Sequence, residues 1–166
     1  SMKNIRKLLF LLSITYPLLL LGQTSDELRS LQGISRIGVV VESIDRMAEQ
    51  DGLRAKSFQT DIELRLRQLG IDVVDGEDLQ GPVIYPYLYL KVLPIKADEL
   101  EFYAVSIELE FIQLVQLIGE VPYIIDAITW QDGGVGLYGT SKVDKARDFV
   151  IDLVNEFAND YFKANR

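Results

Sequence analysis

Residues 101–117 read EFYAVSIELEFIQLVQL, in which apolar side chains alternate with polar or small ones along most of the stretch. This period of two is typical of a β-strand with one buried face. We predict that the core side holds Tyr103, Val105, Ile107, Leu109 and Phe111, opposite Phe102, Ala104, Ser106, Glu108 and Glu110. The alternation slips after Phe111, and a strand of this length rarely stays flat. We therefore expect a β-bulge or bend near Ile112 and Gln113.

The preceding segment, residues 87–93 (YLYLKVL), alternates in the same way. Leu88, Leu90 and Val92 are expected on the core side, and Tyr87, Tyr89 and Lys91 on the opposite side. Residues 94–100 would join the two strands into an antiparallel hairpin. Further strands are predicted at 34–44, at 71–74 and at 123–131. The first of these is rich in valine and isoleucine and is expected to be buried on both faces.

Two helices complete the predicted order. Apolar residues at helical spacing indicate a helix over 55–69, and Gly70 stands where a helix often ends in glycine. A second amphipathic helix follows Ser141, a candidate N-cap, with one apolar face made of Val143, Ala146, Val150, Leu153, Phe157 and Tyr161. The order β-α-β-β-β-β-α predicts an α+β two-layer sandwich, a mostly antiparallel sheet with two helices packed on it. We expect one domain over residues 34–166.

The N-terminus has the pattern of an export signal. Basic residues in positions 2–7 precede an apolar run over 8–21 and then Gly22, so we predict a signal peptide over residues 1–22 that is cleaved. A retained membrane anchor is the second interpretation, because the run is shorter than the roughly 20 apolar residues of a transmembrane helix and contains Pro17. Residues 23–33 form a polar lead-in. The expected location is the periplasm or the medium of a Gram-negative-type bacterium, without stable membrane insertion after cleavage.

Composition excludes several function classes. The chain has no histidine and no cysteine, which rules out Ser-His-Asp and thiol catalysis and removes the usual ligands of zinc, copper and haem. The formal net charge is −8, and the predicted leader holds only basic charges, so the remainder is more acidic still. Such a surface repels phosphate backbones, and nucleic-acid binding is not expected. A cationic partner, or solubility alone, is the natural interpretation.

Two motifs suggest cofactors but do not support them. Residues 134–139 (GVGLYG) match G-x-G-x-x-G, yet a dinucleotide fold also needs a parallel strand after the following helix, and none is visible before Arg166. We interpret Gly133 and Gly134 as a turn, with residues 135–138 extending or pairing a strand. The acidic loop of Asp72, Asp75, Glu77 and Asp78 lacks the spacing of a calcium loop. No cofactor and no metal are predicted.

The candidate binding residues are aromatic and acidic. Tyr87 and Tyr89 share one side of their strand, and Glu108 and Glu110 share the non-core side of the neighbouring strand. Tyrosines are favoured in recognition surfaces, although they also serve as cross-strand packing partners. Trp130 ends a strand beside the glycine stretch and is either a contact residue or the lid of the core.

A resemblance adds to this reading. The segment YAVSIEL at 103–109 with Gln113, the pair Thr129-Trp130, the glycines up to Gly136 and the ending over residues 150–165 resemble uncharacterised secreted bacterial α/β proteins. The resemblance includes no catalytic motif and implies no activity. The predicted order of elements is also similar to small envelope-assembly domains, such as the N-terminal domain of the translocation protein TolB.

The sequence therefore predicts a non-enzymatic, exported protein-interaction module with an unknown protein partner in the cell envelope. A small-molecule or glycan-binding domain using Tyr87, Tyr89 and Trp130 is the first alternative. A carboxylate-dependent hydrolase is the second, since paired carboxylates remain available for acid–base chemistry.

Overall fold

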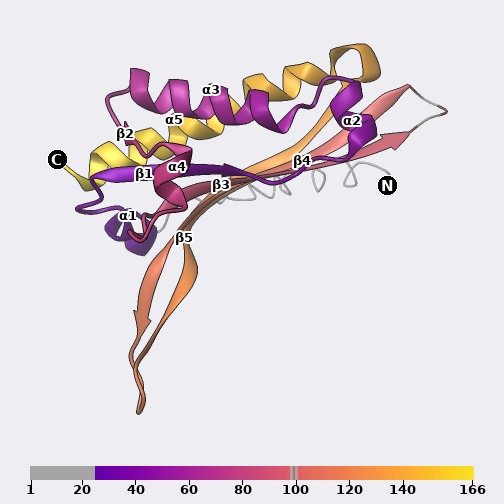
Figure 1. Cartoon of the computed structure of the whole chain (residues 1–166). Coiled ribbons are helices and arrows are strands. Elements are labelled where there is room, and N and C mark those ends of the chain that lie inside the picture. The colour runs from indigo at the N-terminus through magenta and orange to yellow at the C-terminus, as the bar shows by residue number, and fades with distance from the viewer. Residues whose placement is uncertain (1–24, 98, 100) are drawn as a thin grey trace, which may run out of the picture.

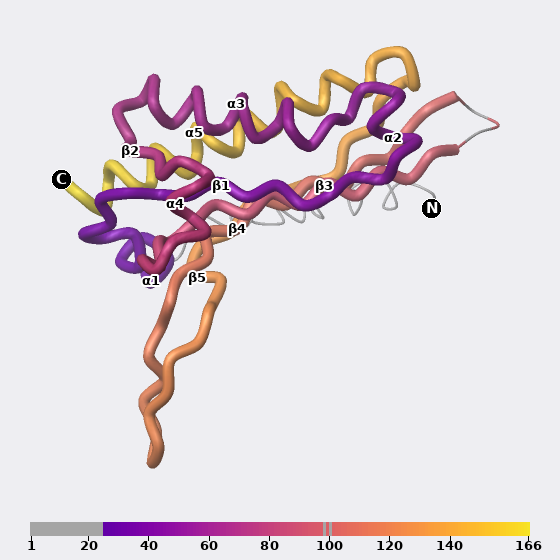
Figure 2. Tube along the Cα trace, viewed as in Figure 1, coloured from indigo at the N-terminus to yellow at the C-terminus, as the bar shows by residue number. Residues whose placement is uncertain are grey.

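The computed structural model describes residues 25–97, 99 and 101–166. Figures 1 and 2 show a sheet with long helices along one side and a narrow hairpin that projects from the other. In chain order the elements are α1 (Ser25–Ser30), β1 (Arg36–Val41), α2 (Arg46–Gln50), α3 (Ala55–Gln68), β2 (Asp72–Val73), α4 (Gly76–Leu79), β3 (Tyr87–Ala97), β4 (Phe102–Leu117), β5 (Tyr123–Gly139), the 3₁₀ helix η2 (Thr140–Lys145) and α5 (Ala146–Ala164).

The strands form one five-stranded sheet in the order β2-β1-β3-β4-β5. β1 runs parallel to both β2 and β3, and β4 runs antiparallel to both of its neighbours, β3 and β5. Most paired residues are therefore antiparallel. The predicted α+β sandwich and its order of main elements are confirmed.

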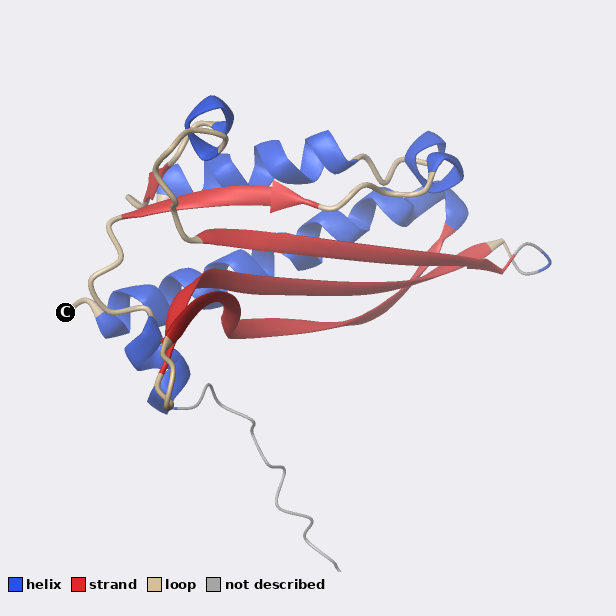
Figure 3. Cartoon of the chain, turned by 60° about the horizontal axis from the view of Figure 1, so that its bottom comes forward, coloured by secondary structure: helices blue, strands red, loops and turns tan. Residues whose placement is uncertain are grey.

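The core lies between the sheet and the two long helices, α3 and α5, which Figure 3 shows behind the strands. The predicted alternation of β4 is confirmed, because every second side chain from Tyr103 to Phe111 is at most 2% exposed. β3 follows the same rule, with Leu88, Leu90 and Val92 buried. Phe157 of α5 stands at the centre, with its ring 5.2 Å from that of Phe111 and 5.1 Å from that of Trp130.

Helix α3 ends as its sequence predicts. Gly70 has a positive φ of 86°, and the amides of Gly70 and Ile71 donate to the carbonyls of Arg67 and Leu66. This is the Schellman arrangement, in which glycine adopts the left-handed conformation at no steric cost. Ile71 is 2% exposed and supplies the accompanying apolar contact.

Strand β1 is buried on both faces only in its first half. Ile37 and Val39 face the core, and on the other side Leu79 of the short helix α4 lies directly over Gly38. Any side chain at position 38 would collide with Leu79. From Val40 onward the strand is partly exposed. The prediction of a strand within residues 34–44 is therefore correct, but burial on both faces is limited to its first half.

Strand β3 runs through Pro94, which the sequence reading placed in the connecting loop. The amide of Glu42 donates to the carbonyl of Leu90, so even-numbered residues of β3 direct their backbone groups toward β1. β1 has ended at Val41, before it would reach Pro94. The missing amide of proline therefore breaks no ladder hydrogen bond.

The turn predicted at Gly133 and Gly134 is wrong, whereas the extension of a strand through residues 135–138 is confirmed. The glycine-rich stretch is part of β5, which continues without interruption to Gly139. A Cβ atom at Gly133 would lie 2.5 Å from the carbonyl oxygen of Ile107, and one at Gly136 would lie 2.5 Å from the ring of Tyr138. Close packing across the strand, and not a reversal of the chain, accounts for these glycines.

The start of the C-terminal helix differs in detail. A 3₁₀ segment, η2, precedes α5, and neither element has a side-chain hydrogen bond at its N-cap. The cap expected from Ser141 does not form. The predicted signal peptide over residues 1–22 lies outside the described residues. Within the described chain, no helix has the length and apolar character needed to cross a membrane.

Candidate functional site: a projecting hairpin and an open sheet face

The hairpin beyond Phe111 leaves the body of the protein at a β-bulge. Phe111 pairs with Trp130 and Ile112 pairs with Ile128, so Thr129 is the extra residue on β5. The predicted irregularity near Ile112 and Gln113 is thus confirmed. From this point residues 112–128, here called the arm, extend away from the rest of the structure, as Figure 1 shows.

The root of the arm is fixed by helix α1. The side-chain amide of Gln113 donates to the carbonyl of Ser30 at 3.0 Å and to Oγ1 of Thr129 at 2.7 Å. The hydroxyl of Ser30 donates to the carbonyl of Thr129 at 3.2 Å. The bulge is therefore held in place from outside the sheet.

The arm exposes large apolar side chains. Ile118 at its tip is 99% exposed, Val121 is 77% exposed and Ile124 is 65% exposed. The other large apolar side chains exposed on the arm are Leu114, Leu117, Tyr123, Ile125 and Ile128. Scattered apolar residues are normal on a surface, but a cluster on one protruding element is typical of an interaction site.

Among the described residues, no helix covers most of the face of β3, β4 and β5 that lies away from α3 and α5, here called the open face (Figure 3). Tyr87 and Tyr89 lie on it as predicted, with their rings edge to face at 6.5 Å between centroids. Burial raises the pKa of Tyr87, and the nearby charge of Asp126 at the base of the arm raises it further. The two tyrosines therefore stand where the open face meets the arm.

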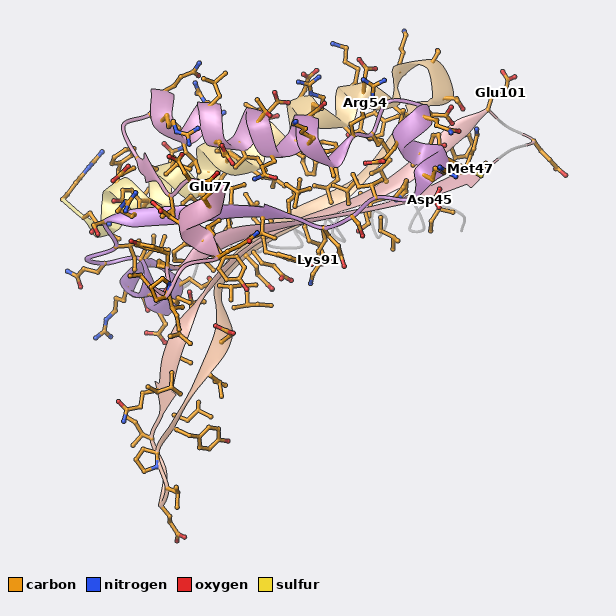
Figure 4. All side chains as sticks on the ribbon, viewed as in Figure 1. Asp45, Met47, Arg54, Glu77, Lys91 and Glu101 are labelled. Atoms are coloured by element: carbon orange, nitrogen blue, oxygen red, sulfur yellow. The ribbon has the colours of Figure 1, made fainter. Side chains whose placement is uncertain are left out.

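The carboxylates of this face are paired and not free. Lys91 projects from the sheet on the side away from α3 (Figure 4). Its Nζ lies 2.7 Å from Oε1 of Glu110 and 3.9 Å from Oε2 of Glu108. The hydrogen bond to Glu110 raises the pKa of Lys91. Glu110 is only 6% exposed, so the mixed aromatic and acidic patch expected from the sequence reduces to Tyr87, Tyr89 and a partly neutralised Glu108.

Trp130 lies on the opposite side of the sheet, in the core. Its side chain is 0% exposed, and its Nε1 donates to Oδ2 of Asp160 at 3.1 Å. Asp160 is 4% exposed and also accepts from Lys163 at 2.8 Å. Trp130 is therefore the lid of the core and contributes nothing to the open face. The aromatic cluster of Tyr87, Tyr89 and Trp130 that a glycan site would need is not formed.

A second apolar group occupies the far end of the open face. Leu93 and Ile95 of β3 are each 63% exposed, and Val135 and Leu137 of β5 are 74% and 72% exposed. The register places Leu93, Ser106 and Val135 in one row across the sheet, and Ile95, Ala104 and Leu137 in the next. We call these four large side chains the apolar patch.

The two strands that carry the arm, β4 and β5, hold acidic side chains but no basic ones. No lysine or arginine occurs between residues 97 and 141, whereas residues 102–139 hold five carboxylates: Glu108, Glu110, Glu120, Asp126 and Asp132. The hairpin of β4 and β5 therefore favours positively charged partners over acidic ones.

Other parts of the described surface show weaker candidates for a binding site. A solvent-open groove of ≈ 440 Å³ lies between α3 and α5. The ion pair of Arg147 and Asp61 lies in it, with the guanidinium 2.6 and 2.7 Å from the two carboxylate oxygens. In the acidic loop, Asp72 pairs with Arg36 and Asp75 with Arg67. Over the described residues, no group of three or more acidic side chains is placed to hold a metal ion.

Sequence reasoning missed the arm and the apolar patch. The signal was present, because Val135, Leu137 and most residues after Phe111 are apolar, but apolar residues also fit a buried strand. No protein family matches this chain, and no curated protein sequence matches it. The assignment of function therefore depends on the geometry described above.

Proposed function

We propose that this protein is a non-enzymatic, exported interaction module that binds another protein through the arm and the adjoining open face. The exposed apolar cluster on the arm carries this proposal, because keeping such a surface in water costs free energy that a partner would recover. The arm is apolar on both sides, so a partner that grips it from two sides buries more area than one that touches a single side.

The proposal of export comes from the predicted leader. The charge of the surface fits the same picture, since an acidic module favours a cationic or mixed partner over nucleic acid or anionic lipid. The two tyrosines at the base of the arm would extend the contact, because aromatic side chains contribute much of the affinity in protein interfaces.

Site-specific crosslinking tests the proposal. A photoreactive amino acid at Ile124 in the arm is expected to capture a discrete protein in intact host cells, at the expense of the uncrosslinked chain. The matched control is the same amino acid at Leu64 on α3, which is 53% exposed but lies on the helical side. Excess purified protein should compete with the adduct at Ile124. Equal labelling at both positions, or adducts with lipid alone, would reject the proposal.

A further inference from the structure

The free edge of β5 carries a second inference, which rests on the proposed function and specifies one mode of contact. β5 is the last strand of the sheet, and the ladder of residues 132–139 is formed with β4 in the described structure. We propose that the edge between Gly133 and Gly139 receives an extended, basic and apolar segment of a partner protein as a sixth strand.

The backbone of this edge points outward at known positions. The amide of Thr140 donates to the carbonyl of Glu101, which fixes even-numbered residues here as those bonded toward β4. The amide of Gly133 instead donates to the side chain of Asp132 at 2.7 Å. Gly133, Val135, Leu137 and Gly139 therefore direct their amide and carbonyl groups away from β4, where an added strand would meet them.

The edge lacks the features that normally protect such strands. Natural sheets guard long edges with lysine, proline, bulges or a covering element. Residues 131–139 read QDGGVGLYG, with no proline and no basic residue, and the bulge at Thr129 comes before them. Asp132 is the only charged residue, and its own side chain occupies one outward amide. The edge is thus left available over the stretch beside the apolar patch.

The side chains indicate what the added strand contains. Val135 and Leu137 stand on the open face, 74% and 72% exposed, at the end of two cross-strand rows. Alternate apolar residues of a sixth strand would continue these rows and cover the patch, and directly opposed side chains are the pairs that stabilise a sheet. Main-chain hydrogen bonds would supply affinity, and the apolar patch would supply specificity.

The charge of the hairpin indicates that the β5 edge binds a partner protein and not a second copy of this chain. An edge-to-edge dimer would bring together two hairpins that each hold five carboxylates and no basic residue. Like charges at an interface oppose association, whereas lysine or arginine at the alternate positions of the added strand would lie on the same side of the sheet as Asp132, which pairs with Leu109. The occupant is therefore a basic, apolar segment of another protein.

The test uses the full chain and a synthetic peptide that alternates valine and lysine, labelled for fluorescence anisotropy. Two control peptides have the same composition: one is scrambled, and one carries N-methyl groups on alternate amides, which blocks strand pairing without changing charge. We expect the alternating peptide to bind at least about tenfold more tightly than either control. Equal binding of all three would show charge attraction alone and overturn the inference.

Two variants locate the site. Val135→Pro removes one outward amide and is expected to lower affinity about tenfold or more, whereas Val135→Ala keeps the amide and should lower it less. Circular dichroism checks that both are folded, and the N-methyl comparison stands even if Val135→Pro is not. A dimer in light scattering that Val135→Pro abolishes would also overturn the inference. The crosslink at Ile124 does not involve this edge. If that crosslink still forms but the peptide does not bind, strand addition is rejected while the proposed function stands.

Discussion

Strands β4 and β5 pass through two different environments, and the bulge at Thr129 separates them. Before the bulge, α5 covers one side, and the side chains of Ile107, Leu109 and Phe111 are 0% exposed. Beyond it the strand remains rich in apolar residues, yet Leu114 is 44% and Leu117 is 38% exposed. Apolar residues in a strand thus do not by themselves predict burial, which depends on a second layer that the strand itself does not encode.

The difference divides the molecule by role. Stability is concentrated where α3 and α5 meet the sheet, because burial of apolar area is the main favourable term in folding. The arm adds contact area without adding to the core. Four substitutions test this division, ordered by the size of the expected effect.

Phe157→Ala should cause the largest loss. The ring is 0% exposed and contacts Phe111 and Trp130, so its removal leaves a cavity in the centre of the covered face. The expected cost is about 3–5 kcal/mol in the free energy of unfolding, measured by urea denaturation. Phe162→Ala on the same helix is the control, because that side chain is 36% exposed. Similar losses for both variants would contradict the packing described.

Asp160→Ala should cause the next largest loss of stability. It leaves the Nε1–H group of Trp130 buried without its acceptor, which costs about 1–3 kcal/mol. Urea denaturation together with the tryptophan fluorescence of this single indole reports both stability and environment. Asp152→Ala, at an exposed position of the same helix, is expected to have little effect. If Asp152→Ala costs as much, the bond to Trp130 is not the cause.

Asp51→Asn should have a smaller effect that depends on pH. Hydrogen bonds from Lys96 at 2.8 Å and Tyr103 at 2.6 Å lower the pKa of Asp51 below its ordinary value. A carboxyl whose pKa is lower in the folded state stabilises the fold at neutral pH, and this contribution is lost as the pH falls through the folded pKa. The variant should therefore be less stable than the parent at neutral pH and differ less from it at about pH 2. A difference independent of pH would point to altered packing.

Ile124→Ser on the arm should have the smallest effect on stability. The side chain is 65% exposed, and surface substitutions usually change the free energy of unfolding by less than about 0.5 kcal/mol. The matched control is Ile107→Ser on β4, where the side chain is 0% exposed and the loss should be severe. A large loss with Ile124→Ser would mean that the arm packs against something in solution and is not free.

Local patterns predicted the fold well where one residue type has one physical meaning. Gly70 ended α3, and the slip after Phe111 marked the bulge, because each signals a backbone requirement. Pro94 was wrongly placed in a loop, and Gly133 and Gly134 were wrongly interpreted as a turn. A strand tolerates these residues depending on where the neighbouring β1 ends and on which atoms pack against the glycines. Neither can be read from the sequence alone.

The candidate site was predicted only in part. Tyr87 and Tyr89 were placed correctly, because strand geometry fixes their side relative to Leu88 and Leu90. Glu110 was expected to be exposed, but its burial beside Lys91 follows from a cross-strand pairing that one strand cannot reveal. The role of Trp130 was left open, and only the position of Asp160 on α5 explains why the indole is buried.

The bulge at Thr129 also has an evolutionary consequence. Six residues of strand carry the end of the arm about 20 Å from the core, so residues near its tip do not share neighbours with those that hold the fold together. Substitutions at sites so far apart act independently on stability. Selection can therefore revise what the arm recognises, residue by residue, while the fold that supports it stays unchanged.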